Sequence, residues 1–251
     1  MLQIILDLSL EQAMILIAVA LFIGMSKTGV QGLGLAAIPL LALVFGARES
    51  TGLMVPMLIM ADIYAVLYYH RSANWKHILR LLPWAIFGIL AGVIAGAYIS
   101  HEGFRILLSG IVVAGLGIMV LRERKGSGEK IPTGHWFAAI IGILGGFASM
   151  VGNAAGPVFA VYLLAMRLPK NSLIGTGAWF YFIINLFKLP FHIWIWKTVS
   201  LPTLTLNLAV LPFILIGAWL GIQVVKAFSE KAYRIFVVAT TLVSALVLII
   251  R

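Results

Sequence analysis

Long runs of apolar residues, separated by short polar or glycine-rich stretches, follow one another along the whole chain. The clearest uncharged runs are Leu81 to Ile99 and Leu204 to Val225, and two more contain a single arginine each, Phe104 to Leu121 and Ala232 to Ile250. A helix rises 1.5 Å per residue, so about 20 apolar residues cross the roughly 30 Å hydrocarbon layer of a membrane. Both faces of each run are apolar, with Gly and Ala interleaved as in packed membrane helices. The pattern predicts an all-α polytopic membrane protein.

The apolar runs form two sets of five, one on each side of a strongly polar stretch. They end in the first half near Met25, Gly46, Tyr69, Ile99 and Leu121, and in the second near Val151, Met166, Trp196, Val225 and Ile250. The polar stretch is Arg122 to Lys130, with Pro132 and Gly134 just after it. We therefore expect a first transmembrane repeat over residues 1–121, a cytoplasmic linker over 122–134 and a second transmembrane repeat over 135–251.

Residues of the two halves match at a nearly constant spacing. An offset of 123 pairs Ser26 with Ser149, Gly29 with Gly152, Gly52 with Gly175 and Asp62 with Asn185. Further on, an offset of 129 pairs Pro83 with Pro212, Gly88 with Gly217, Gly92 with Gly221 and Arg105 with Arg234. We interpret these matches as an ancient duplication. Because each half has an odd number of segments, the two repeats are expected to be inverted, with the second segment of each short or broken.

The basic residues test this topology, since Lys and Arg collect on the cytoplasmic side of membrane proteins. With the linker inside, the residues that also fall inside are Arg71, Lys76, Arg80, Arg122, Arg124, Lys125, Lys130, Arg167, Lys170, Lys226, Lys231 and Arg234. Those that fall outside are Arg48, Arg105, Lys197 and Arg251. The distribution favours inversion over a parallel repeat and predicts a multi-pass protein of the bacterial inner membrane with both termini periplasmic. No basic region precedes the first segment, so no cleaved signal peptide is expected.

Composition narrows the classes of function. Charged residues are 10% of the chain, against about 25% in an average soluble domain. The net charge of +10 then marks membrane topology rather than a nucleic-acid partner. The absence of cysteine excludes thiol relays and Cys-ligated metals. The five histidines lack metal-ligand spacing and are expected near the membrane interfaces, and no nucleophile elbow is present. We expect no cofactor, no bound metal and no enzymatic activity.

The second apolar segment of each half is too short to span a membrane comfortably. Leu33 to Gly46 is about 21 Å long as a helix, and Pro157 to Met166 is about 15 Å. A glycine-rich run precedes each segment, Ser26 to Gly34 in one half and Gly152 to Pro157 in the other. Irregular backbone survives at membrane depth only where protein or a wet cavity satisfies it. The free N–H groups and positive dipole of such half-helices favour anions, and matching breaks in two halves are typical of a transporter's binding site.

These features give a candidate substrate-binding set that contains residues of the two breaks and two residues from the third segment of the second half. Its members are Ser26, Lys27, Thr28, Gly29, Gln31, Gly32, Gly34, Gly152, Asn153, Ala154, Gly156, Pro157, Asn185 and Lys188. Asp62 lies in an otherwise uncharged segment, and an ionisable group inside the membrane indicates function, so it is the candidate for proton coupling. Other interpretations stay open: the runs are surface turns, Lys27 snorkels, Asn153 and Gln31 only cap helices, or Asp62 forms a purely structural ion pair with Lys27 or Lys188.

The two breaks also carry a family resemblance. In the first half the resemblance lies in the run Gly24 to Gly34, followed by Pro39. In the second half it lies in Gly152 to Pro157, Leu168 to Lys170, Gly175 to Phe180 and Asn185 to Lys188. With these residues the sequence closely resembles the sulfite exporter TauE/SafE family, also called toluene sulfonate uptake permeases. The resemblance runs from about Gly24 to Ile250. It implies a duplicated membrane fold that transports sulfite, sulfoacetate or other organosulfonates.

From these observations we expect a membrane transporter of small anions that works by alternating access, with Asp62 as a possible carrier of a coupling proton. A passive anion channel is the alternative. The partners expected are the small anionic substrate and the lipid bilayer, and no nucleic acid. The sequence leaves open the exact substrate, the direction of transport, the coupling ion and the oligomeric state.

Overall fold

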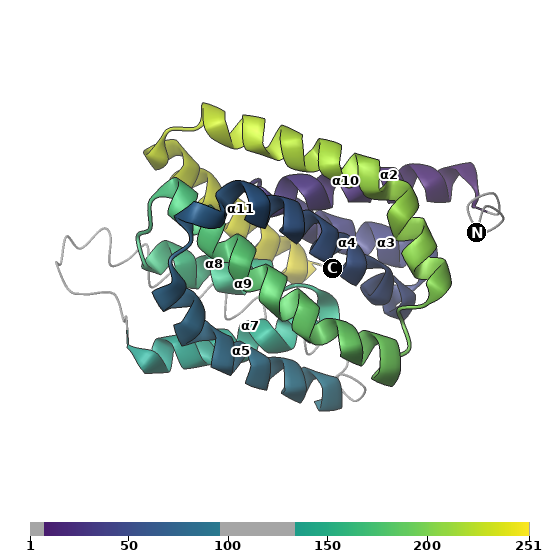
Figure 1. Cartoon of the computed structure of the whole chain (residues 1–251), viewed down its shortest axis with the longest axis horizontal. Coiled ribbons are helices and arrows are strands. Elements are labelled where there is room, and N and C mark those ends of the chain that lie inside the picture. The colour runs from purple at the N-terminus through teal and green to yellow at the C-terminus, as the bar shows by residue number, and fades with distance from the viewer. Residues whose placement is uncertain (1–7, 96–133, 251) are drawn as a thin grey trace. The chain divides into compact units, whose positions relative to one another are not determined.

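The computed structural model describes residues 8–95 and 134–250, and every regular element in these two ranges is helical (Figure 1). The elements are α2 (Leu10–Lys27), α3 (Leu33–Phe45), α4 (Ala47–Tyr69), the 3₁₀ turn η1 (His70–Ser72), α5 (Trp75–Ala95), α7 (His135–Gly152), α8 (Gly156–Ala165), α9 (Lys170–Pro190), the π-helical η2 (Phe191–Ile195), α10 (Leu201–Ala227) and α11 (Glu230–Ile250). The predicted fifth segment of the first half, Phe104 to Leu121, and the linker residues 122–133 lie outside the described residues.

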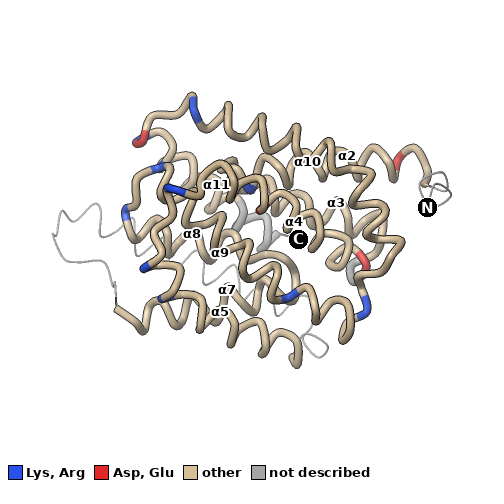
Figure 2. The backbone as a smooth tube through the Cα atoms, in the orientation of Figure 1, with Lys and Arg blue, Asp and Glu red and all other residues tan. Residues whose placement is uncertain are grey.

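The described helices confirm the prediction of an all-α polytopic membrane protein. Six of them are long and apolar enough to cross a membrane, whereas Leu33–Phe45 and Gly156–Ala165 are the shorter apolar helices. Those two are the second segments that the sequence predicted to be short. Charged residues lie mostly at helix ends, and the helix bodies are largely free of them (Figure 2).

The chain forms two compact units, each of which combines parts of both halves of the sequence. Unit 1 contains residues 1–71 and 178–228, and unit 2 contains residues 72–177 and 229–251. The long helix α9 passes from unit 2 into unit 1 within its length. The units therefore do not coincide with the two sequence repeats, 1–121 and 135–251, that the duplication predicts.

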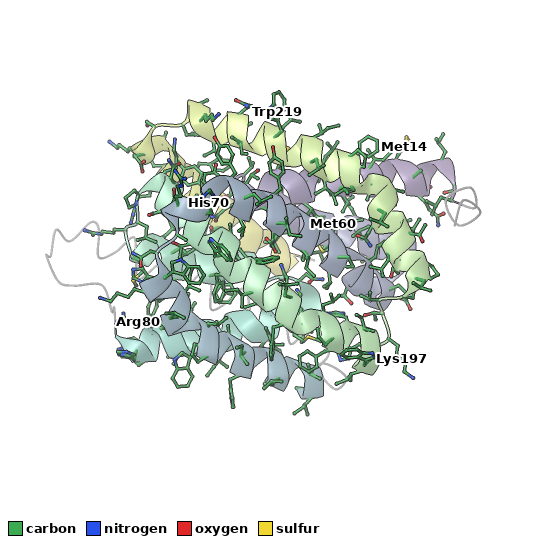
Figure 3. The ribbon with its side chains drawn as sticks, in the orientation of Figure 1. Met14, Met60, His70, Arg80, Lys197 and Trp219 are labelled. Atoms are coloured by element: carbon green, nitrogen blue, oxygen red, sulfur yellow. The ribbon has the colours of Figure 1, made fainter. Side chains whose placement is uncertain are left out.

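In unit 1, α2 and α10 lie side by side, and α3 and α4 pack beside them (Figure 1). Their core consists of buried aliphatic residues from all four helices, among them Leu16, Ile23, Leu41, Met57 and Ile214. The outer faces of the pair carry large exposed apolar side chains such as Met14 and Trp219 (Figure 3). An apolar surface of this kind suits contact with lipid.

In unit 2, α5 and α7 form the corresponding close pair, and α8 packs against α7 and α11. Helix α8 is buried on every side from Pro157 to Ala165. A short helix that is apolar all round needs such a position, because no face of it suits water.

Glycines set the close approach of both helix pairs, and they do so at corresponding places. A Cβ at Gly217 would overlap the carbonyl oxygen of Leu21, and a Cβ at Gly88 would overlap that of Ile143. In the same way Gly24 faces the carbonyl of Ile214, and Gly146 faces that of Ala85. A third matching contact joins Gly221 to Met25 and Thr28 in unit 1, and Gly92 to Phe147 and Met150 in unit 2.

These contacts relate α5 to α10 by the offset of 129 found in the sequence. They relate α2 to α7 by 122, one residue less than the 123 of the sequence match. The same helix pairing within each unit supports the duplication. The inversion of one repeat against the other stays a prediction.

Candidate functional site

The first break lies in unit 1, between the end of α2 at Lys27 and the start of α3 at Leu33. Gly29 and Gly32 have φ values of 122° and 98°, which side chains other than glycine rarely adopt. The N–H of Val30 bonds the carbonyl of Met25 at 3.0 Å, and that of Gly29 bonds Ser26 at 3.3 Å. The break is therefore an ordered turn whose backbone depends on two glycines.

Protein groups satisfy the polar backbone where α2 ends. The Thr28 hydroxyl, which is buried, donates to the carbonyls of Gly24 at 3.1 Å and Met25 at 3.2 Å. The Tyr69 hydroxyl, from the last turn of α4, donates to the Thr28 carbonyl at 3.4 Å. A Cβ at Gly34 would meet Ser26 Oγ at 2.9 Å, so the Ser26 hydroxyl lies beside the first turn of α3. Gln31 and Gly32 form the connecting turn, with Gly32 as N-cap of α3.

Lys27, Asp62 and Asn185 meet directly in unit 1. Lys27 Nζ lies 2.8 Å from Asp62 Oδ1, with side-chain exposures of 10% and 0%. Asn185 Nδ2 donates to Asp62 Oδ2 at 2.5 Å. Lys27 Nζ also lies 4.5 Å from the centre of the Tyr181 ring, a cation–π arrangement. The three side chains come from α2, α4 and α9, so three helices converge on one carboxylate.

Lys188 extends this group along α9. It lies three residues after Asn185, on the same face of the helix, and its side chain is fully buried. It is close enough to Lys27 and Asp62 to interact with both electrostatically. We call Lys27, Asp62, Asn185 and Lys188 the polar cluster.

The polar cluster carries two basic groups and one acidic group, a net charge of +1 when all three are ionised. The other described acids on the contributing helices are Glu11 on α2 and Glu49 on α4. Their spacing along the helices puts them about 24 Å from Lys27 and about 20 Å from Asp62. Among the residues that the structure describes, Asp62 is therefore the acid of α2 and α4 that lies within the polar cluster.

The second break lies in unit 2, between α7 and α8. Asn153 adopts the left-handed conformation with φ 54°, and its N–H bonds the carbonyls of Ala148 and Ser149. The N–H of buried Ala154 bonds Ala148 at 3.2 Å, which completes a Schellman-type end to α7. The Asn153 backbone thus caps a helix, one of the roles that the sequence left open.

Helix α8 then begins at Gly156 with Pro157 in its first turn. A Cβ placed on Gly156 would meet no atom within 4 Å, so space is open beside the start of this half-helix. The second break is described within unit 2 alone, and the structure brings together only the unit 1 members of the candidate set.

Sequence reasoning missed three residues around the polar cluster. Tyr69 and Tyr181 contact the first break only through the tertiary fold, and nothing local in the sequence indicates this. His192 was expected near a membrane interface, and its candidacy was missed, because its side chain is fully buried in the π-helical turn after Pro190. The spacing of Asn185, Lys188 and His192 on one helix face was the signal available for it.

No three His, Asp or Glu side chains within residues 8–95 and 134–250 gather as a metal site. The polar cluster instead offers ammonium groups, an amide and a carboxylate. Such groups bind anions and exchange protons.

Comparison with known proteins identifies the kind of protein to which this site belongs. The family model described as sulfite exporter TauE/SafE matches residues 16–248, nearly the whole chain. No curated protein matches the chain, and no solved structure does. Both breaks and the whole polar cluster fall inside the matched range. This multi-pass membrane protein therefore belongs to the sulfite exporter TauE/SafE family, a family of membrane transporters.

Proposed function

We propose that this protein transports a small anion, namely sulfite, sulfoacetate or another organosulfonate, by alternating access. The anion binds at the polar cluster. The observation that carries this proposal is the polar cluster itself, in which two lysines, one carboxylate and one amide gather beside the first break of unit 1. Ionisable groups inside a membrane protein are costly and mark the paths of substrates and ions. An anion suits this cluster because its ammonium groups outnumber its carboxylate.

The surroundings of the cluster suit a sulfur oxyanion. Such an anion carries several acceptor oxygens around one sulfur atom, and each needs a donor. Lys27 supplies an ammonium group, Asn185 an amide, and Ser26 a hydroxyl beside the first turn of α3. The N-terminus of α3 favours negative charge through its dipole. We assign Thr28, Gly29, Gln31, Gly32 and Gly34 to shaping this part of the site.

In unit 2 we assign the second break a comparable role. Gly152, Asn153 and Ala154 end α7 in a fixed turn, and Gly156 and Pro157 begin α8 next to open space. A substrate oxygen can approach a glycine closely because no Cβ intervenes. This half-helix start is a contact surface for the anion within unit 2.

Asp62 gives a simple means of proton coupling. While Asp62 is ionised, it holds the Lys27 ammonium at 2.8 Å. A proton added to the carboxylate removes the negative charge, breaks the ion pair and leaves Lys27 available to a substrate anion. Proton and anion then bind together, and loss of the proton displaces the anion.

Transport into proteoliposomes tests this proposal. We expect saturable sulfite uptake that is driven by a proton gradient and shows counterflow. Lys27→Ala should raise the KM for sulfite at least about tenfold, equivalent to about 1.4 kcal/mol. The matched control is Lys231→Ala, which removes an exposed lysine at the start of α11 and should leave KM unchanged.

The same assay separates a carrier from its alternatives. Flux without saturation or counterflow would identify a passive anion channel. An unchanged KM in Lys27→Ala would remove this lysine from the site. Asp62→Asn should abolish the response to the proton gradient, and an intact response would reject the coupling role.

A further inference from the structure

His192 is a buried base with one ring nitrogen that lacks a partner. Its Nδ1 lies 2.9 Å from Thr198 Oγ1, whereas its Nε2 has no hydrogen-bond partner in the described part of the chain. The side chain is 0% exposed. A buried polar atom without a partner is uncommon and calls for a functional explanation.

The ring is held in one orientation by its surroundings. The His192 carbonyl accepts the N–H of Thr198 at 2.9 Å and that of Val199 at 3.2 Å. A Cβ at Gly52 of α4 would overlap Thr198, so α4 fixes this turn from the other side. The Trp196 ring meets the imidazole edge-on, with 5.1 Å between ring centres. The unpartnered Nε2 is thus not a product of a loose side chain.

The hydrogen bonds also indicate which nitrogen carries the proton. The Thr198 hydroxyl lies 3.5 Å from the His192 carbonyl and donates to it. A hydroxyl has one proton to donate, so in the arrangement in which this proton goes to the carbonyl, Thr198 Oγ1 accepts from Nδ1–H. The neutral ring then presents a bare lone pair at Nε2, which can accept a proton.

His192 lies in line with the polar cluster. Asn185, Lys188 and His192 follow at spacings of three and four, which puts them on one face of α9 and its π-helical continuation. Lys188 interacts electrostatically with Lys27 and Asp62, and also with His192. The row from Asn185 to His192 is about 10 Å long. π-Helical turns occur often at functional sites.

The row ends near exposed residues. Trp194 and Ile195 are exposed, and the Lys197 side chain points away from the helices (Figure 3). Of the charged side chains that the structure describes on the elements packed here, Lys188 is the one that interacts electrostatically with His192. Glu49 of α4 and Lys197 are exposed. His192 therefore lies between a buried acid and an accessible end of the chain segment.

We propose that His192 is the outer residue of a proton path that connects to Asp62 through Lys188. The Lys188 ammonium gives a proton to the Nε2 lone pair through a bridging water, since no described side chain lies within hydrogen-bond distance of Nε2, and Lys188 regains a proton from the Asp62 carboxyl. The sum is one proton moved from Asp62 to His192, with no other bond changed. The path rests on the proposed proton-coupled transport. In it, His192 carries the proton and does not contact the anion.

The test separates exchange from gradient-driven transport in proteoliposomes that hold the full chain. In His192→Gln, sulfite exchange at zero proton gradient should stay within about twofold of wild type. Net uptake driven by a proton gradient should fall at least about tenfold. The control, His70→Gln, changes an exposed histidine at the end of α4 and should leave both rates unchanged.

Each other outcome overturns the proposal. Gradient-driven uptake equal to wild type in His192→Gln would show that no proton passes this residue. Loss of exchange and of driven uptake together, with an unchanged melting temperature, would place His192 in the anion path instead. If His192→Gln does not fold, His192→Asn takes its place, because its amide can still reach Thr198 Oγ1. Absence of any sulfite transport by wild type would instead reject the proposed function itself.

Discussion

Asp62 is the residue on which the two buried lysines of the polar cluster depend. Its Oδ1 forms the ion pair with Lys27, and its Oδ2 accepts a hydrogen bond from the Asn185 amide. Removing one partner of a buried ion pair leaves the other charge uncompensated, which costs about 3–5 kcal/mol. Replacing both partners by apolar groups costs far less. Asp62 therefore links stability to charge in this protein.

This dependence predicts a non-additive pair of substitutions. Asp62→Asn should lower the melting temperature of the detergent-solubilised protein strongly, because Lys27 then loses its ion pair. Adding Lys27→Met should restore most of that loss, since it removes one unpaired charge. Thermal unfolding of the two single variants and the double variant gives the coupling energy. Losses that simply add would mean that the pair contributes little to stability.

At the scale of helices, close packing rests on glycines at matching positions of two pairs. Gly217 and Gly88 each face a backbone carbonyl of the neighbouring helix, Leu21 in unit 1 and Ile143 in unit 2. Small residues allow membrane helices to approach in this way. Since neither carbonyl can move without moving its helix, a side chain at either glycine has no space.

Substitutions at Gly88 and Gly217 should destabilise the protein, whereas a substitution at Gly156, which lies beside open space, should not. Gly88→Val and Gly217→Val should each destabilise the protein by at least about 1–3 kcal/mol, the usual cost of overpacking. Gly156→Ala should leave the melting temperature nearly unchanged, because a Cβ there meets no atom within 4 Å. Equal thermal unfolding of all three variants would contradict the packing described for α5, α7, α2 and α10.

Many helix ends and lengths were predictable from the sequence, whereas contacts that depend on tertiary packing were not. The apolar run expected to end near Tyr69 does so as α4, and the two short second segments are α3 and α8. Asp62 and Asn185, equated by the offset of 123, proved to be in contact. The burial of His192 was not predicted, because flanking Trp194 and Trp196 indicate an interface and outweighed its spacing of four residues from Lys188. The bond from Tyr69 to Thr28 depends on tertiary packing.

At the scale of the whole molecule, the contact between Asp62 and Asn185 has a geometric meaning. When two repeats are related by a two-fold axis, equivalent residues touch each other only near that axis. The contact therefore favours a pseudo-two-fold relation between α4 and α9 in unit 1. Such an axis in the membrane plane is typical of inverted repeats in transporters.

The predicted inversion can be measured with single cysteines, since the chain has none of its own. Ser72→Cys, at the end of η1, should react with a membrane-impermeant thiol reagent only from the cytoplasmic side. Lys197→Cys, in the corresponding turn after η2, should react only from the periplasmic side. Labelling of both from one side would favour a parallel repeat.

The central claim is that the polar cluster binds an anion through its two lysines, which outnumber its one carboxylate. Isothermal titration of the solubilised protein with sulfite tests it directly. We predict saturable binding by wild type and by Lys231→Met, and a Kd at least about tenfold higher for both Lys27→Met and Lys188→Met, which each remove one of these lysines. Sulfite binding of equal affinity in all four proteins would contradict the account.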